Sequence, residues 1–332
     1  MHVSADIEVN PFENVNQYVL DIKNQTSSSA ASVLIIQNGA IVNEWYSGRH
    51  DGSEHSRVVD ANSRFNVASV RKTYLGFAIS LALYERRIES LDDAAGKYLD
   101  DLDDELTGDV TIRHLLTHTH GLSSAGTNMF PAGSDWKYNN AGVNLLIRMV
   151  QNVFDQPLAK VIEERLLMPY GLSETGWRKD KSDHLVWLNE AYLGEQGDEA
   201  NLFVSTRDLG FWGYIHLTKG FYRGRQILPR QVFEQAAKII TPPSLDQRLP
   251  RNGFFWQVQD SEARAASELG EQLPEGSYQS LGFYGNALLI IPAYNVAAVR
   301  MLNQTTSNPP GYDYLEDIRT FGDRVLACIK KV

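Results

Sequence analysis

The sequence predicts a mixed α/β (α+β) fold, in which one antiparallel sheet is flanked by helices and a helical region is inserted into it. Two observations lead to this prediction. Segments with strand character lie near both ends of the 332-residue chain, whereas apolar residues in the middle recur at helical spacing. Strands at both ends with helices between them indicate one sheet that both ends of the chain complete.

The first two strands are expected to form a hairpin. Branched apolar residues at 33–36 and 40–42 flank Asn38 and Gly39, and an Asn-Gly pair in that setting is a strong signal for a tight β-turn. Three later segments, rich in aromatic and branched residues, have strand character as well: 254–258, 286–291 and 296–302.

Helical spacing is clearest over residues 69–87, which are apolar on most sides and therefore predict a buried helix. A last helix is expected over 314–329. Five further segments are also expected to be helical: 111–119, 139–154, 158–167, 206–219 and 229–240. We therefore expect one domain over 1–332, with its α/β part at about 1–68 and 200–332 and its helical part at about 69–199.

Composition and charge exclude several classes of protein. The formal net charge of -10 would repel a polyanion, so nucleic acid is not an expected partner. No apolar run is long enough to span a membrane. The first residues lack a basic segment followed by an apolar run, so we expect no signal peptide and a cytoplasmic location, or secretion if a leader has been removed. The single cysteine, Cys328, excludes an internal disulfide.

A candidate nucleophile lies at the start of the buried helix, where residues 69–72 read Ser-Val-Arg-Lys. At this spacing the Ser69 hydroxyl and the Lys72 amine lie on one helix face, within hydrogen-bond reach. A serine becomes nucleophilic when a neighbour takes its proton, and a lysine can do so only when burial keeps it neutral. Ser134 and Lys137 have the same spacing, but they lie in a turn, so Ser69 is the better candidate. The motif alone also fits an N-capping serine with a surface lysine.

Three further segments accompany this motif. A Tyr-Asn-Asn triplet begins at Tyr138, residues 114–122 read His-Leu-Leu-Thr-His-Thr-His-Gly-Leu, and residues 201–209 read Asn-Leu-Phe-Val-Ser-Thr-Arg-Asp-Leu. Together they resemble the serine β-lactamase and penicillin-binding-protein-like superfamily, in particular its class C β-lactamases, D,D-peptidases and family VIII esterases. The resemblance covers nearly the whole chain. It implies a three-layer sandwich that forms a single β-lactamase-like catalytic domain and needs no cofactor.

The resemblance also implies a role for each matching residue. Ser69 would attack a carbonyl carbon to give an acyl-enzyme, and Lys72 would take the proton of the serine. Tyr138 would pass this proton to the leaving group and later activate water. Asn140 would orient Lys72 and contact the substrate, although an asparagine at this position also suits a helix cap.

The third motif of the family is where this sequence departs from its relatives. Family members usually carry Lys-Thr-Gly or His-x-Gly on a strand beside the site, whereas residues 280–282 read Ser-Leu-Gly. Gly282 would let the substrate approach the strand closely. The backbone N–H of Phe283 would form an oxyanion hole with that of Ser69. Ser280 provides no cation for a substrate carboxylate, which favours neutral esters or amides over penicillin-like substrates.

Other kinds of site were weighed against this one. His114 and His118 are four residues apart, but no third ligand follows at a recognisable spacing, so no metal site is expected. No Gly-x-Ser-x-Gly elbow surrounds Ser69 and no histidine follows His216, which argues against a Ser-His-Asp triad. His120 is either a substrate contact at the mouth of the site or a solvated loop residue. Four aromatic residues in loops are candidates to line an apolar cleft: Phe130, Trp136, Trp187 and Tyr284.

We therefore expect a serine hydrolase that acts through an acyl-enzyme on an ester, amide or lactam, with a small-molecule or peptide substrate. Its activity would be that of a carboxylesterase, a D,D-peptidase or a β-lactamase. The alternative is a catalytically weak penicillin-binding or sensor-like protein that retains the fold. The missing cation of the third motif is the observation that favours this alternative. The sequence indicates neither the physiological substrate nor the oligomeric state.

Overall fold

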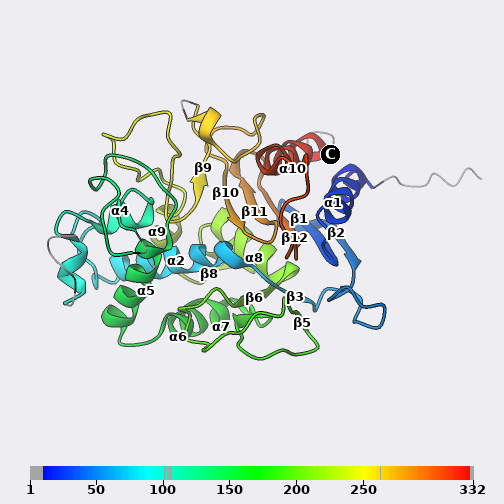
Figure 1. Ribbon diagram of the computed structural model, residues 1–332, viewed down its shortest axis with the longest axis horizontal. Coiled ribbons are helices and arrows are strands. Elements are labelled where there is room, and N and C mark those ends of the chain that lie inside the picture. Colours follow the sequence, from blue (N-terminus) through cyan, green and yellow to red (C-terminus); the bar gives the residue numbers. More distant parts are fainter. Residues whose placement is uncertain (1–9, 101, 103–106, 124, 262, 330–332) are drawn as a thin grey trace, which may run out of the picture.

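The computed structural model describes residues 10–329 apart from 101, 103–106, 124 and 262 (Figure 1). The expectation of a missing signal peptide concerns residues 1–9, which lie outside these ranges. The central element is a six-stranded sheet with the order β2-β1-β12-β11-β10-β9, in which all neighbours are antiparallel. Its strands are β1 (Ala30–Gln37), β2 (Ala40–Gly48), β9 (Gln257–Val258), β10 (Tyr278–Gly282), β11 (Asn286–Ile291) and β12 (Val296–Leu302).

Both ends of the chain complete this sheet, as predicted, because β1 pairs with β12 along its length. Asn38 and Gly39 form the expected tight turn of the first hairpin, with φ values of 52° and 82°. These positive angles match the twist of the two strands. The strand expected over 254–258 is wrong in its first part. Phe255 has a φ of 62°, which bends the chain, so that only the last two residues pair with β10.

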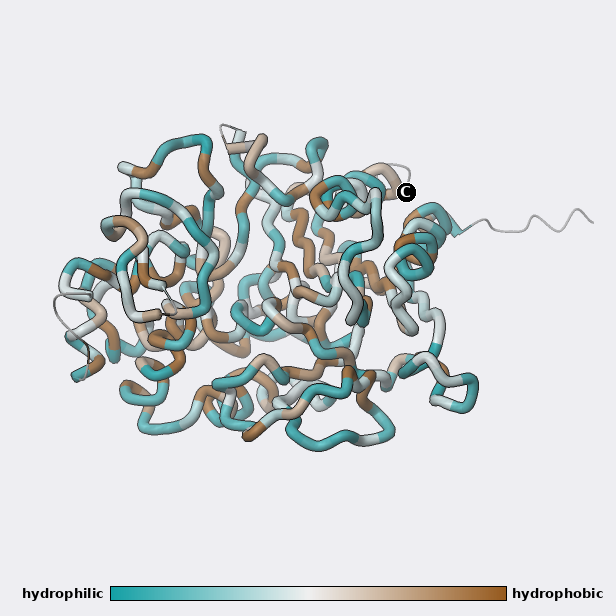
Figure 2. The backbone as a smooth tube through the Cα atoms, in the orientation of Figure 1, coloured by the Kyte–Doolittle hydropathy of each residue, from teal (hydrophilic) through white to brown (hydrophobic). Residues whose placement is uncertain are grey.

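Helices cover the two faces of the sheet and make three layers (Figure 1). The helices α1 (Glu13–Gln25) and α10 (Tyr314–Ile329) pack on one face, and α8 (Thr206–Leu217) packs on the other. Because side chains alternate along a strand, Val33 of β1 faces α1 and α10 while Leu34 faces α8. Both faces are buried, and the central strands are accordingly among the most hydrophobic parts of the chain (Figure 2).

The helical region follows β3 and precedes β6 in the sequence. It contacts α8 through helix α2 (Lys72–Tyr84) (Figure 1), where the rings of Tyr74 and Trp212 stack. The α2 helix is buried over nearly its whole length, as predicted. The remaining α-helices among the described residues are α4 (Ile112–Leu116), α5 (Asn140–Phe154), α6 (Leu158–Ile162), α7 (Met168–Tyr170) and α9 (Arg230–Glu234). Single helical turns of other types are η1 (Ala68–Arg71), η2 (Ala95–Tyr98), η3 (Glu163–Leu167), η4 (Arg264–Ala266) and η5 (Pro292–Tyr294).

Several helices are shorter than predicted, α4 and α9 among them. The α4 helix ends before His118, whose φ of 58° cannot continue a right-handed helix. The α9 helix ends at Glu234, and Ala236 and Ile240 reach the core from the turns that follow. The periodic apolar pattern there reflects burial rather than a continuous helix.

Several short strands were not predicted. Four of them form a second sheet with the order β4-β6-β3-β5, and two form a separate hairpin. They are β3 (Arg64–Asn66), β4 (Thr175–Trp177), β5 (Leu185–Val186), β6 (Leu202–Ser205), β7 (Phe221–Tyr222) and β8 (Arg225–Gln226). Strands of two to four residues carry too little alternation to be detected. The second sheet matters for the site because β3 leads directly into the turn that carries Ser69.

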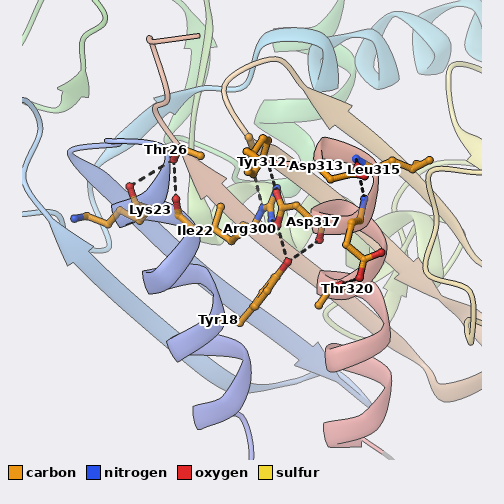
Figure 3. Close-up of polar contacts among 12 residues, drawn as sticks. Tyr18, Ile22, Lys23, Thr26, Arg300, Tyr312, Asp313, Leu315, Asp317 and Thr320 are labelled. Atoms are coloured by element: carbon orange, nitrogen blue, oxygen red, sulfur yellow. Dashed lines mark hydrogen bonds and ion pairs between the residues drawn. The ribbon is translucent and has the colours of Figure 1, made fainter. Parts of the chain in front are cut away.

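A buried ion pair joins the sheet to the helices of the outer layer (Figure 3). Arg300 of β12 donates to both carboxylate oxygens of Asp317 on α10, over 2.7 and 3.0 Å. Tyr18 of α1 and Tyr312 donate their hydroxyls to the same carboxylate, over 3.0 and 2.6 Å. One carboxylate therefore links α1, α10 and the sheet. Among the described residues, no helix combines the length and apolar character that a bilayer crossing requires.

Candidate active site

The turn between β3 and α2 presents Ser69 at the edge of the sheet. Asn66, the last residue of β3, accepts a hydrogen bond from the backbone N–H of Ala68 on its side-chain oxygen, over 2.9 Å. Ala68 has a φ of 46°, a conformation that a residue with a Cβ adopts only when its surroundings enforce it. Ser69 then lies in the 3₁₀ turn η1 and not, as predicted, in the α-helix itself, which begins at Lys72.

Three functional groups meet at this turn. The Lys72 Nζ lies 3.0 Å from the Ser69 Oγ, and the Ser69 Oγ lies 2.6 Å from the Tyr138 hydroxyl. The Lys72 amine also donates to the Tyr138 hydroxyl, which closes a triangle of hydrogen bonds. The structure therefore brings together the three residues predicted to be catalytic, although Ser69 and Tyr138 are 69 residues apart in the chain.

The Lys72 amine is buried beside a second cation. Lys72 is only 3% exposed. Burial, and next to it the charge of Arg71, lower the pKa of Lys72 to about 6. Within the described part of the chain, no carboxylate acts to raise this pKa. At neutral pH the amine is therefore mostly uncharged and able to accept a proton.

The pKa of the Tyr138 hydroxyl is raised, whereas that of the Lys72 amine is lowered. Burial raises the pKa of its hydroxyl, and the hydrogen bond with Ser69 and the charge of Arg71 only partly oppose this. The phenol therefore keeps its proton at neutral pH and can donate it. The residue is nevertheless 47% exposed, so a bound substrate could reach it.

His118 holds the segment that carries Tyr138. Its ring lies 4.6 Å from the Tyr138 ring, between centroids, and its backbone oxygen accepts from the N–H of Lys137 over 3.0 Å. Burial, followed by the charges of Lys72 and His120, lowers the pKa of His118 to about 3, so this ring is neutral. From the sequence, His118 was a candidate only for a metal ligand, and its position in the cavity wall was not predicted.

Asn140 begins α5 and lines the same cavity, but the structure shows no hydrogen bond between its side chain and the Lys72 amine, contrary to expectation. In the described part of the chain, the Lys72 amine donates to Ser69 and Tyr138. The helix cap is Asn139, whose side-chain oxygen accepts from the N–H of Ala141 over 2.7 Å. Asn140 is therefore not used for capping and is exposed at the cavity.

The end of β10 packs against the turn of the nucleophile. A Cβ added to Gly282 would lie 2.4 Å from the backbone oxygen of Val67, so only a glycine fits there. This contact brings the backbone of residues 282–283 to the side of Ser69. Ser280 faces the cavity from the same strand, and the side chain of Phe283 is 85% exposed at its rim. No cation stands on this strand at position 280.

These residues surround one cavity of about 520 Å³. All seven residues predicted for the site line it: Ser69, Lys72, Tyr138, Asn140, Ser280, Gly282 and Phe283. The remaining wall was mostly missed. It includes Asn252, Phe255, Gln257, Glu268 and Tyr314, which come from loops, from β9 and from the start of α10 and carry no sequence motif.

Two of the four loop aromatic residues that were candidates for the cleft line the cavity. Trp136 and Tyr284 line the cavity, and the Trp136 Nε1 donates to the side-chain oxygen of Asn252 over 2.9 Å. Phe130 and Trp187 are not among the lining residues, and Trp187 instead stacks on Phe203 with 5.5 Å between ring centroids.

The expectations for His120 were wrong. Its side chain is buried away from the cavity, and its Nδ1 accepts from the N–H of Leu122 over 3.0 Å. It is therefore neither a substrate contact nor a solvated loop residue. His114 has a structural role as well, because its Nδ1 accepts from the N–H of Thr111 in the cap of α4. Over the described residues, no group of three or more His, Cys, Asp or Glu side chains is arranged to hold a metal ion.

Comparisons with known proteins show the family and the fold of the chain. A family model described as Beta-lactamase matches residues 15–319. An uncharacterized protein of Alkalihalophilus pseudofirmus is 38% identical over 96% of this chain and 97% of its own length. A solved structure described as EstCE1, a hydrolase with promiscuous acyltransferase activity, has a TM-score of 0.74 and 18% identity, covering 94% of this chain and 98% of that one. A class C beta-lactamase has a TM-score of 0.74 and 17% identity, covering 98% of both chains. The two structures confirm the expected three-layer sandwich.

Proposed function

The chain belongs to the beta-lactamase family, and from that premise we propose that it is a serine hydrolase that acts through an acyl-enzyme on Ser69. The observation that carries this proposal is the triangle of hydrogen bonds among the Ser69 hydroxyl, the Lys72 amine and the Tyr138 phenol at an open cavity. We further propose that the chain acts as one catalytic domain, because both of its parts contribute walls to this cavity.

Acylation begins with the attack of the Ser69 Oγ on the carbonyl carbon of the substrate, while the proton of the hydroxyl passes to the neutral Lys72 Nζ. The negative charge on the carbonyl oxygen is stabilised by the backbone N–H groups of Ser69 and Phe283. When the tetrahedral intermediate collapses, the bond to the leaving group breaks. Tyr138 gives its proton to the leaving group and is reprotonated by the Lys72 ammonium.

Deacylation reverses these transfers with water in place of the leaving group. A water molecule loses a proton to Tyr138, which relays it to Lys72, and the resulting hydroxide attacks the acyl carbon. The ester bond to Ser69 breaks, and the serine oxygen recovers its proton from Lys72. The enzyme returns to its starting state without a cofactor, and the products are an acid and an alcohol or amine.

The substrate is proposed to be an ester or amide of a small molecule or peptide, ahead of a penicillin-like lactam. Ser280 offers no cation for a carboxylate on the side of β10, and the neighbouring wall carries the carboxyl of Glu268 instead. A nucleic-acid substrate is disfavoured by the net charge of -10. The alternative of a penicillin-binding or sensor-like protein is not favoured by the relatives named above. The cytoplasmic location stays a prediction from the sequence.

Hydrolysis of p-nitrophenyl acetate and nitrocefin by Ser69→Ala tests the proposal. We expect at least about a 10³-fold loss of kcat on every substrate that the wild type hydrolyses, because among the described residues no other serine or threonine hydroxyl accepts a hydrogen bond from the Lys72 amine. The matched control is Ser134→Ala. Ser134 belongs to the second Ser-x-x-Lys pair but is exposed and donates to the backbone oxygen of Pro131. It should keep wild-type rates. Undiminished hydrolysis by Ser69→Ala would refute the assignment of the nucleophile.

Covalent labelling tests the assignment of Ser69 as the nucleophile independently of the kinetic measurements. A fluorophosphonate should add one phosphonyl group to the wild type, and peptide mapping should place it on Ser69. Ser134→Ala should be labelled equally, and Ser69→Ala should not be labelled. Labelling at a different serine would contradict the proposed acyl-enzyme.

A further inference from the structure

Arg71 is a buried cation in the cavity wall that the proposed reaction does not use as a proton carrier. It occupies the turn η1 between Ser69 and Lys72, is 8% exposed and lines the cavity. Its Nε donates to the backbone oxygen of Glu199 over 3.1 Å. Among the described residues, no carboxylate forms an ion pair with it, and its two terminal NH₂ groups have no protein partner.

This state is unusual for a guanidinium. A buried charge is normally compensated by an opposite charge, because its loss of hydration is costly. Arginine carries five N–H donors and stays protonated in proteins. With one donor held by the Glu199 backbone, the side chain is fixed in place. The fork of its terminal donors remains available in a cavity whose wall it forms.

The guanidinium also lies near the reacting groups. Its charge lowers the pKa of Lys72 and acts on the Tyr138 hydroxyl. The other charged side chain that lines the cavity is Glu268, which accepts a hydrogen bond from the Gln257 amide rather than from Arg71. The positive charge of Arg71 is therefore not neutralised from across the cavity.

We propose that Arg71 is a substrate-binding residue, whose terminal N–H groups bind a carboxylate carried by the substrate while the reacting carbonyl lies at Ser69. A guanidinium fork matches a carboxylate with two parallel hydrogen bonds. The substrate class is therefore an ester or amide that bears a carboxylate, directed toward Arg71 and away from Glu268. This inference rests on the proposed hydrolase function and adds a specificity to it.

A purely electrostatic role of Arg71 is the competing explanation. Loss of the charge would then raise the pKa of Lys72 and slow the reaction, but it would do so equally for every substrate. The ratio of kcat/KM for a carboxylate-bearing ester to that for its neutral counterpart separates the two roles, because both esters use the same Ser69 and Lys72.

The experiment measures this ratio for two matched pairs of esters. In one pair the carboxylate is in the acyl part, with mono-p-nitrophenyl glutarate against p-nitrophenyl valerate. In the other it is in the leaving group, with 3-carboxyphenyl acetate against phenyl acetate. We expect the wild type to prefer the anionic member of at least one pair, and Arg71→Gln to lower that ratio by about 10- to 100-fold. Arg71→Lys should keep part of the preference, since it keeps the charge without the fork.

Arg225→Gln is the matched control, because Arg225 is an exposed arginine on β8 away from the cavity. It should leave both ratios unchanged. If Arg71→Gln lowers kcat/KM equally for both members of each pair, the binding role is refuted. A wild type without preference for either anionic ester refutes it as well.

A binding measurement keeps this test separate from the hydrolase proposal. Ser69→Ala is titrated with monomethyl glutarate and with dimethyl glutarate while the tryptophan fluorescence, to which Trp136 in the cavity wall contributes, is followed. The monoester should bind at least about tenfold more tightly, and Ser69→Ala/Arg71→Gln should lose this difference. Equal responses to the two esters would overturn the inference. Absence of wild-type hydrolysis together with tighter monoester binding would refute the function and support the carboxylate site.

Discussion

The Lys72 amine combines a position beside a hydroxyl with a lowered proton affinity. A lysine in water has a pKa of about 10.4 and is a poor base at neutral pH because it is already protonated. Burial in the helical region and the adjacent Arg71 bring this pKa to about 6. The chain thus uses one buried turn to supply both a base and the group from which it takes a proton.

This pKa predicts the pH dependence of the reaction. Because Lys72 must be uncharged to accept the proton of Ser69, kcat/KM for p-nitrophenyl acetate should be constant above about pH 6 and fall tenfold per pH unit below it. The rate is lost as the pH falls through the folded-state pKa, since Lys72 is then protonated. A pH profile of kcat/KM provides the measurement. A decrease of kcat/KM that instead follows the ordinary pKa of a lysine would contradict the role of Lys72 as the base.

Tyr138 is predicted to act through its hydroxyl alone. Tyr138→Phe keeps the ring beside His118 and removes the proton relay, so kcat should fall by about 10²- to 10⁴-fold. The melting temperature should change little, because the residue is half exposed. Tyr84→Phe, an exposed tyrosine at the end of α2, serves as the control and should retain full activity. Comparable rates for wild type and Tyr138→Phe would remove Tyr138 from the mechanism.

The contact between the end of β10 and the turn η1 is the element-level feature that sets the geometry of the site. Its tightest point is Gly282 against the backbone oxygen of Val67. Gly282→Ala would place a Cβ 2.4 Å from that oxygen, so β10 and the turn must separate. A shift of about 1 Å in an oxyanion hole costs roughly 10²-fold in rate. We therefore expect kcat to fall by about that factor.

The control for this substitution is Gly52→Ala, since a Cβ at Gly52 would meet no heavy atom within 4 Å and its φ is not in the left-handed region. Both variants are to be assayed for kcat and for melting temperature. If Gly282→Ala keeps the kcat of wild type, the close approach of β10 is not required for oxyanion stabilisation.

Elements with long periodic patterns were predictable from the sequence. The expected bounds of β11, β12 and α10 agree with the structure, because each has an apolar face that packs over its whole length. The turn η1 was not distinguished from α2, since a 3₁₀ turn and an α-helix differ by one hydrogen-bond step at nearly the same side-chain spacing. Ser69 and Lys72 still came within reach of each other.

The part of the site that the sequence did not predict depends on tertiary folding. Asn252 and Glu268 reach the cavity from segments without periodicity or motif, and Tyr314 reaches it from the start of α10, whose periodicity predicts a helix but not a place at the site. Arg71 lay inside the recognised motif, but only the fold reveals that its guanidinium is buried and has no carboxylate partner in the part of the chain that the structure describes. Motifs identify groups that react, whereas burial and pairing depend on residues far away in the chain.

On the scale of the whole molecule, the cavity lies where two separate regions of the chain meet. The helical region supplies Ser69, Lys72 and Tyr138, and the C-terminal part of the sheet supplies β10. The sheet in turn depends on both ends of the chain, because β1 pairs with β12. The position of β10 against the nucleophile therefore depends on contacts that hold the outer layer to the sheet.

The ion pair between Arg300 and Asp317 is the strongest candidate for such a contact. Asp317→Asn removes the charge that compensates a fully buried guanidinium, and losing one partner of a buried pair costs about 3–5 kcal/mol of unfolding free energy. We therefore expect Asp317→Asn to unfold at a lower denaturant concentration than wild type. Asp246→Asn, which breaks the exposed pair with Arg248, should leave the midpoint nearly unchanged. Equal midpoints for Asp317→Asn and wild type would show that the pair does not stabilise the fold.

The same pair predicts a dependence of stability on pH. Burial alone would raise the pKa of Asp317, but the charge of Arg300 and the hydrogen bonds to the carboxylate outweigh it and hold the pKa below the ordinary aspartate value. A carboxylate with a lowered folded-state pKa contributes stability above its unfolded-state pKa and loses it as the pH falls through the folded-state value. Wild type should therefore lose unfolding free energy in acid, below about pH 4, and Asp317→Asn should lose less over the same interval. Denaturant titrations at several acidic pH values measure both slopes. Parallel losses in the two proteins would assign the acid sensitivity to other carboxylates.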